Sequence, residues 1–157
     1  MTTVAVSDAG PLIHLAEIGS LELLDAFDTL LVPEVVHDEV EVGGLPDGLS
    51  EVADKVVAAD GGDTGVGGEL DAGERAAISV ARGRELVLLT DDLAAREVAS
   101  EAGIDVHGSI GVIALGYSRG LLDRDEAASR MRALQRETSL FVTEAVVERG
   151  IRLLDER

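Results

Sequence analysis

Aspartates directly follow two apolar segments that are predicted to be strands. Asp8 comes after the run 4–6, and the pair Asp91 and Asp92 comes after the continuous apolar run 86–89. Side chains at the carboxyl ends of parallel strands open into one crevice above the sheet, so these carboxylates can lie close together. Carboxylate oxygens are the ligands that Mg²⁺ prefers, and a bound Mg²⁺ or Mn²⁺ can activate a water for attack on a phosphodiester. The pattern therefore indicates a hard-cation site suited to phosphodiester hydrolysis.

Each of these aspartates also has a simpler structural explanation. Asp8 lies just before Pro11, a residue suited to a first helical turn, so Asp8 can be a helix N-cap. One of Asp91 and Asp92 is expected to cap the helix that follows, but two caps are not needed. The pair is therefore a stronger indication of a site than Asp8 alone.

Two glutamates are further candidates for the same site. Glu74 lies three residues after Asp71, which is the spacing of a capping box, and Glu39 lies in the middle of an acidic helix, where a solvated face is the default. The chain has 31 acidic residues, so several will lie near strand ends by chance. Spacing alone therefore does not decide between a metal site and ordinary capping and surface roles.

Strands and helices alternate along the first two thirds of the chain, and the remainder is predicted to be helical. The predicted strands are 4–6, 30–32, 56–59, 86–89 and 104–106. The predicted helices are 11–18, 21–26, 33–42, 72–82, 93–102 and 109–117, followed by two that carry 127–134 and 140–154. Gly83 is expected to end the fourth of these helices, and 45–49 and 61–68 are expected to be loops.

This alternation predicts an α/β fold with a parallel sheet that is covered by helices on both sides. No internal repeat or linker divides the sequence, so we predict a single domain over 1–157. The chain has no run of about 20 apolar residues and no signal peptide at its start, so we expect a cytoplasmic protein without a membrane segment.

The composition limits both the metal ligands and the partners. The chain has no cysteine, so a metal must bind oxygen or imidazole, and His14, His37 and His107 lie on different elements without metal-ligand spacing. We expect these histidines to be structural or surface residues. The net charge is −18 and Lys55 is the only lysine, a composition that resembles proteins of salt-accumulating halophiles. Such a charge is tolerated when salt screens it, so folding is expected to need salt, and a stable nucleic-acid binder is less favoured than a nuclease.

Four segments together resemble the PIN domain family, metal-dependent ribonucleases that include the VapC toxins of toxin–antitoxin pairs. The segments are 4–13 (VAVSDAGPLI), 33–40 (PEVVHDEV), 70–78 (LDAGERAAI) and 86–96 (LVLLTDDLAAR). The likeness is closest to a PIN subgroup with a Gly-Glu helix and an Asp-Asp pair. It implies a three-layer α/β/α sandwich with a central parallel sheet.

The resemblance also implies the site and the function. It places the family's acidic residues on Asp8, Glu39, Glu74 and Asp92, with Asp91 as a further possible metal ligand. These residues would bind Mg²⁺ or Mn²⁺ and cleave RNA. A small antitoxin would be the partner, and the chain would form a homodimer for which the helices near Leu134 and Val147 are candidates.

One departure from the family pattern leaves a second function open. Many members follow the first aspartate with Thr-Ser, whereas Ala9 and Gly10 stand here, and Ser7 is the nearby hydroxyl that could substitute. The alternative is a catalytically weak PIN-like domain that acts as a binding or regulatory module. A phosphotransfer receiver is a third class, which is disfavoured because Lys55 precedes a middle strand instead of following a late one.

Overall fold

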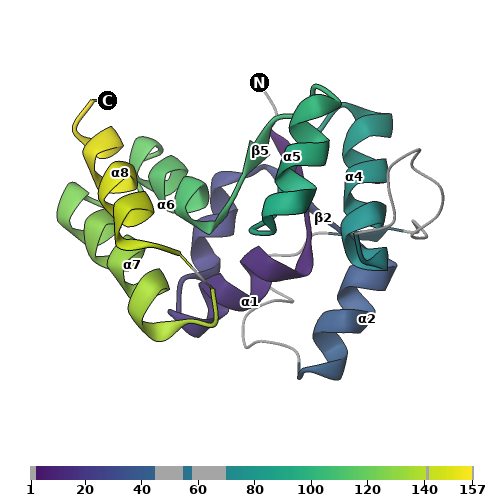
Figure 1. The fold of residues 1–157 in the computed structure, drawn as a ribbon, viewed down its shortest axis with the longest axis horizontal. Coiled ribbons are helices and arrows are strands. Elements are labelled where there is room, and N and C mark those ends of the chain that lie inside the picture. The colour runs from purple at the N-terminus through teal and green to yellow at the C-terminus, as the bar shows by residue number, and fades with distance from the viewer. Residues whose placement is uncertain (1–2, 45–54, 58–69, 141, 157) are drawn as a thin grey trace.

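A five-stranded parallel sheet forms the centre of the computed structural model, which describes residues 3–44, 55–57, 70–140 and 142–156 (Figure 1). The strand order is β3-β2-β1-β4-β5, and β1 pairs with β2 on one side and β4 on the other. The strands are β1 (Val4–Ser7), β2 (Thr29–Pro33), β3 (Lys55–Val57), β4 (Val87–Leu89) and β5 (Val106–His107). The order reverses at β1, so the crevice at the carboxyl ends of β1 and β4 is the expected position of a site in such a sheet.

Helices cover both faces of this sheet. The helical elements are α1 (Ala9–Glu17), the 3-10 helix η1 (Leu21–Ala26), α2 (Glu34–Val42), α4 (Ala72–Arg84), α5 (Leu93–Glu101), α6 (Ser109–Ser118), α7 (Arg124–Glu137) and α8 (Glu144–Leu154). In Figure 1, α6, α7 and α8 lie on one side of the molecule, and α4 and α5 lie on the other. This arrangement confirms the predicted α/β/α sandwich with a parallel sheet.

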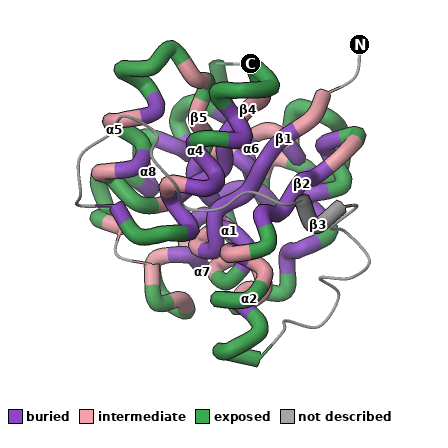
Figure 2. Tube along the Cα trace, turned by 90° about the vertical axis from the view of Figure 1, so that its right-hand side faces the viewer, coloured by how far each residue is buried: buried purple, intermediate pink, exposed green. Residues whose placement is uncertain are grey.

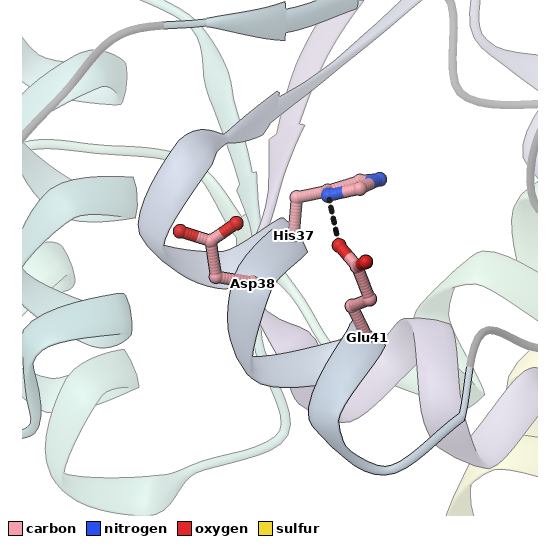
Figure 3. A group of neighbouring side chains, drawn as sticks. All are labelled: His37, Asp38 and Glu41. Carbon is pink, nitrogen blue, oxygen red and sulfur yellow. Dashed lines mark ion pairs between the residues drawn. The ribbon is translucent and has the colours of Figure 1, made fainter.

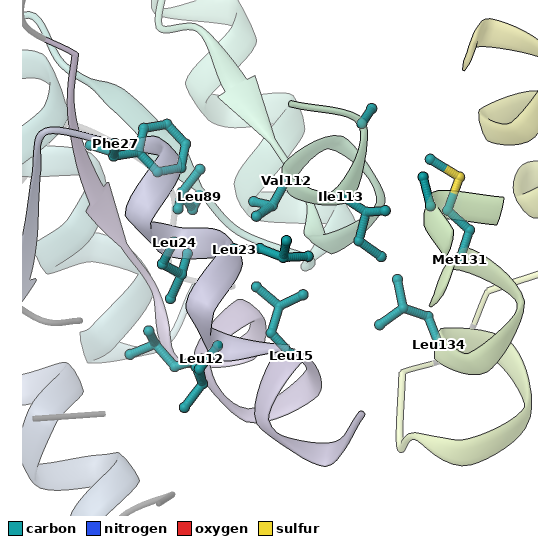
Figure 4. Close-up of a cluster of buried hydrophobic side chains, with 14 of the residues drawn as sticks. Leu12, Leu15, Leu23, Leu24, Phe27, Leu89, Val112, Ile113, Met131 and Leu134 are labelled. Atoms are coloured by element: carbon teal, nitrogen blue, oxygen red, sulfur yellow. The ribbon is translucent and has the colours of Figure 1, made fainter. Parts of the chain in front are cut away.

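Alternate residues of β1, β2 and β4 enter two separate hydrophobic cores. On β4, Leu89 packs with α1, η1 and α6, whereas its neighbour Leu88 packs with α4 and α5. The first core is the larger one and extends through Met131 and Leu134 to α7 (Figure 4). Because successive side chains of a strand point to opposite faces, both layers of helices are fixed to the same three central strands. The tube along β1 is accordingly almost entirely buried (Figure 2).

The boundaries of several elements differ from the sequence predictions. Gly83 lies inside α4, and the helix ends instead at Arg84, followed by the C-cap Glu85, which has a left-handed φ of 55°. Segment 21–26 is a 3-10 helix, and β5 is Val106–His107 instead of 104–106. The predicted loops 45–49 and 61–68 lie outside the described residues. None of the helices in the described part of the chain has the length and apolarity needed to cross a lipid bilayer.

Candidate metal centre

Asp8 lies at the junction between β1 and α1, where it caps the helix and stands at the carboxyl end of a central strand. Its Oδ1 accepts a hydrogen bond from the Ala9 backbone N–H at 2.8 Å, so it caps α1. Its Oδ2 accepts the Thr90 hydroxyl hydrogen at 2.9 Å. The residue is only 6% exposed, and its own N–H donates to the Leu89 carbonyl, which ties β1 to β4. A buried carboxylate is therefore held rigidly at the switch point of the sheet.

Asp92 is held beside Asp8 through Thr90. Asp92 is the N-cap of α5, since its Oδ2 accepts from the Ala95 N–H at 2.8 Å. Its backbone N–H donates to Thr90 Oγ1 at 3.3 Å, and the same hydroxyl donates to Asp8. Thr90 is fully buried at the end of β4. One hydroxyl group thus links the two aspartates that end the central strands.

Glu74 enters the site from the first turn of α4, where it forms a capping box with Asp71. Glu74 Oε1 accepts from the Asp71 N–H at 2.9 Å, and Asp71 Oδ1 accepts from the Glu74 N–H at 2.8 Å. Glu74 is 9% exposed although it is charged. The reciprocal bonds fix the side chain and leave Oε2 outside the capping box.

Glu39 reaches the group from α2 and packs over the backbone of Gly73. A Cβ atom at Gly73 would lie 3.3 Å from Val36 Cγ2, 3.4 Å from Asp71 Oδ1 and 3.5 Å from Glu39 Oε1. A glycine at this position therefore allows α2 and α4 to approach closely, with the carboxylates of Glu39 and Asp71 beside the same backbone atom. Glu39, on the acidic face of α2, is therefore part of the candidate site.

The carboxylates are close enough to raise one another's pKa. Burial raises the pKa of Asp8, with smaller contributions from the charges of Asp71 and Asp92. Burial and then the charges of Asp71 and Asp8 raise the pKa of Glu39. For Glu74, burial and the charges of Asp71, Asp92 and Asp8 raise the pKa to about 7. Mutual repulsion of this kind is expected where several carboxylates share one site and a cation would relieve it.

Comparison with known proteins places the chain in a family. The sequence model of DUF3368, a PIN domain family, matches residues 4–156. The chain belongs to the PIN domain family. Among solved structures it is similar to a PilT N-terminus domain protein, SSO1118, from the hyperthermophilic archaeon Sulfolobus solfataricus P2. That match has a TM-score of 0.58 and 19% identity and covers 70% of this chain and 90% of the other, so it supports the fold alone. No curated protein matches the sequence.

PIN domains are generally nucleases that use divalent metals, and the donor set of this PIN domain fits such an ion. The oxygen donors lie near enough to one another for their charges to interact, and Mg²⁺ retains several waters and needs only a few direct carboxylate ligands. The carboxylate oxygens of Asp8, Glu39, Glu74 and Asp92 do not all lie within 4.8 Å of one another. Coordination partly through water is compatible with that spacing.

Asp91 does not join this group, which counts against its predicted role as a ligand. Its Oδ1 accepts from the Ser109 N–H at 2.6 Å, and its Oδ2 accepts from the Ser109 hydroxyl at 2.5 Å and lies 2.8 Å from His14 Nδ1. Both oxygens therefore serve to join β4, α1 and α6. His14 has the structural role that the sequence predicted, and we remove Asp91 from the proposed ligands.

The Ser7 hydroxyl does not replace the hydroxyls that Ala9 and Gly10 lack. Ser7 is fully buried, and its Oγ donates to the backbone carbonyl of Asp8 at 2.8 Å. The hydroxyl that does contact the site belongs to Thr90. In the sequence, Thr90 stands directly before the Asp91 and Asp92 pair.

A second group of potential ligands lies on the outer side of α2 (Figure 3). Ligand atoms of His37, Asp38 and Glu41 come within 4.8 Å of one another, and His37 Nδ1 lies 3.7 Å from Glu41 Oε2. Asp38 and Glu41 are exposed and His37 is half-buried. A contact between side chains at i and i+4 is an ordinary feature of a solvated helix, so we assign no metal site to this group.

Proposed function

We propose that this PIN domain is a divalent-metal-dependent endoribonuclease that hydrolyses RNA phosphodiester bonds. The observation that supports it most directly is the convergence of Asp8, Glu39, Glu74 and Asp92, which come from four different elements. Asp8 and Glu74 are buried, and they accept hydrogen bonds from the backbone N–H groups of Ala9 and Asp71 and from the Thr90 hydroxyl. Carboxylates that are buried near one another are costly, so their collection at a switch point favours a cation site.

Each side chain has a role that follows from its position. Asp8 and Asp92, held by Thr90, would bind the cation from the strand ends, and Glu74 would bind it through Oε2. Bound Mg²⁺ or Mn²⁺ would supply an activated water and neutralise charge on the phosphate. Glu39 is exposed, so its carboxylate can accept a proton from the water. Since Glu74 holds a proton up to about pH 7 when no metal is bound, binding of the cation would release it.

A cleavage assay on mixed cellular RNA in molar KCl tests this proposal. Wild type with Mn²⁺ should cut RNA, whereas EDTA or Asp8→Asn should reduce the rate by at least about 100-fold, since both remove electrostatic stabilisation of the transition state. The matched control is Asp123→Asn, which alters the exposed N-cap of α7. Activity that survives both EDTA and Asp8→Asn would exclude the metal-nuclease function.

A catalytically weak binding module is the second candidate. It is favoured by Ala9 and Gly10, which remove two hydroxyls beside the first aspartate, and by the Ser7 hydroxyl, which bonds to the backbone. In that case the wild type would retain labelled RNA on a filter with Mn²⁺ and cut none of it. Cleavage at a rate that depends on Asp8 would rule the binding module out.

We also propose that the protein is the toxin of a toxin–antitoxin pair, is cytoplasmic and forms a homodimer. Membership of the PIN domain family supports the toxin role and the cytoplasmic location. For the dimer, the helices near Leu134 and Val147 are the candidates; those two side chains are buried within the chain's own core, and Val146 and Leu153 are the large apolar residues exposed on α8. Growth arrest on induction, relieved by co-expression of a small adjacent gene, would support the toxin role, and unaffected growth would contradict it. Light scattering would measure the mass in solution and so test for the homodimer.

A further inference from the structure

We propose that Asp71 is a fifth acidic residue of the metal centre, a positioning residue that orients Glu74 and adds negative charge for cation binding. The inference rests on the proposed function. The sequence indicates Asp71 only as a helix cap. In the structure it lies between the two glutamates of the site.

The capping box connects Asp71 directly to a proposed ligand. The Asp71 N–H donates to Glu74 Oε1, and Asp71 Oδ1 accepts from the Glu74 N–H. Because Oε1 is engaged in this way, the rotation of the Glu74 side chain is restricted and Oε2 is the oxygen that remains for a cation. The cap of α4 and the orientation of a metal ligand are therefore the same pair of hydrogen bonds.

The position of Gly73 brings the Asp71 carboxylate to the site as well. A Cβ atom at Gly73 would contact both Asp71 Oδ1 and Glu39 Oε1, at 3.4 and 3.5 Å. Two carboxylates from α2 and the start of α4 are thus beside the same small residue. Neighbouring carboxylate charges raise the pKa of Asp8, of Glu39 and of Glu74, and in each case Asp71 is the neighbour that contributes most.

The chain contains a second capping box of the same type, which shows what an ordinary one looks like. Asp123 caps α7, its Oδ1 accepts from the Glu126 N–H at 2.8 Å, and Glu126 Oε1 accepts from the Asp123 N–H at 3.2 Å. Both of those residues are exposed, whereas in the first box Asp71 is exposed and Glu74 is buried, and the acidic residues of the site are on other elements. The two boxes have the same local hydrogen bonds and differ in their surroundings, so they form a matched pair for mutagenesis.

The test is a calorimetric titration with Mn²⁺, in which binding is measured without any cleavage assay. Asp71→Ser and Asp123→Ser both keep a side chain that can cap a helix, so both proteins should melt within about 2 °C of wild type. Asp71→Ser should weaken Mn²⁺ binding about three- to tenfold, the order expected for losing one charge near a divalent ion in a hydrated site. Asp123→Ser should bind Mn²⁺ as wild type does.

A structural role alone would give a different pattern. Asp71→Ser with the Mn²⁺ affinity of wild type, in an experiment where Asp8→Asn weakens binding, would overturn this inference and leave the proposed function intact. No Mn²⁺ binding by the wild type would overturn both. If Asp71→Ser loses affinity, Asp71→Asn distinguishes the contributions, because it keeps the side-chain shape and removes the charge, and it should lose as much affinity as Asp71→Ser.

Discussion

Replacing Glu74 with glutamine is expected to stabilise the metal-free protein above neutral pH. Burial and the charges of Asp71, Asp92 and Asp8 raise the pKa of Glu74 from 4.5 to about 7. One pKa unit corresponds to about 1.4 kcal/mol, so ionising Glu74 destabilises the fold by about 3 kcal/mol. Glutamine can keep the acceptor in the capping box, although a neutral acceptor is weaker, so the net gain in unfolding free energy should be about 1–3 kcal/mol.

The same shift makes the stability depend on pH. Because the pKa of Glu74 is higher in the folded protein than in the unfolded chain, its stabilising contribution is fully present below about pH 4.5 and is lost as the pH rises through about 7. Glutamine does not titrate, so Glu74→Gln should remove this part of the decline. The unfolding free energy of Glu74→Gln should therefore exceed that of wild type by a large margin at about pH 8, and by a small margin or not at all at about pH 5.

Thermal melts followed by circular dichroism in EDTA and molar KCl would measure the effect. At about pH 8 the melting temperature of Glu74→Gln should exceed that of wild type by roughly 3–10 °C. The control is Glu126→Gln, the equivalent change in the exposed capping box of α7, which should alter stability by less than about 0.5 kcal/mol. Addition of Mn²⁺ should raise the melting temperature of wild type more than that of Glu74→Gln, because the amide lacks the charge of the ligand.

One result would refute this reasoning. If Glu74→Gln melted below wild type by the same amount at both pH values, while Glu126→Gln did not, Glu74 would be an ordinary cap whose ionised form stabilises α4. The carboxylates would then not repel one another enough to matter, and the main electrostatic support for a cation site would be lost.

Three further predictions concern other parts of the structure. Asp91→Ala should lower the unfolding free energy by about 1–3 kcal/mol, because Ser109 and His14 lose their buried partner. The same change should leave the Mn²⁺ affinity within about twofold of wild type. A loss of affinity like that of Asp8→Asn would restore Asp91 as a ligand. Gly73→Ala should weaken Mn²⁺ binding in calorimetry, since its Cβ would crowd Val36 Cγ2 at 3.3 Å and push α2, which carries Glu39, away from α4. Binding equal to that of wild type would contradict this role of Gly73. With a net charge of −18, the wild-type melting temperature should rise from dilute buffer to molar KCl, and equal melting temperatures would contradict the requirement for salt.

Local sequence patterns were sufficient for most of the fold. The apolar run at 86–89 and the short run at 4–6 predicted central strands, and both belong to the parallel sheet. The cap at Asp71, a possible cap at Asp8 and a cap at one of Asp91 and Asp92 were also predicted, because capping depends on residues within one turn of the chain. Helix ends were less predictable. Gly83 was expected to end α4, yet the helix continues to Arg84, since a glycine lowers helix stability without preventing the next hydrogen bond.

The sequence by itself determined the class of the fold, the absence of thiolate ligands and the acidic residues available to a site. The tertiary structure decided which acids belong together. Asp91 and Asp92 are adjacent in the chain and equivalent by type, yet one binds Ser109 and His14 and the other lies beside Asp8. Successive side chains leave the backbone in different directions, and only the packing of α1, α4 and α6 around the strand ends determines what each of them meets. For the same reason Asp71 was recognised as a cap from the sequence, while its position between Glu39 and Glu74 depends on how α2 packs against α4.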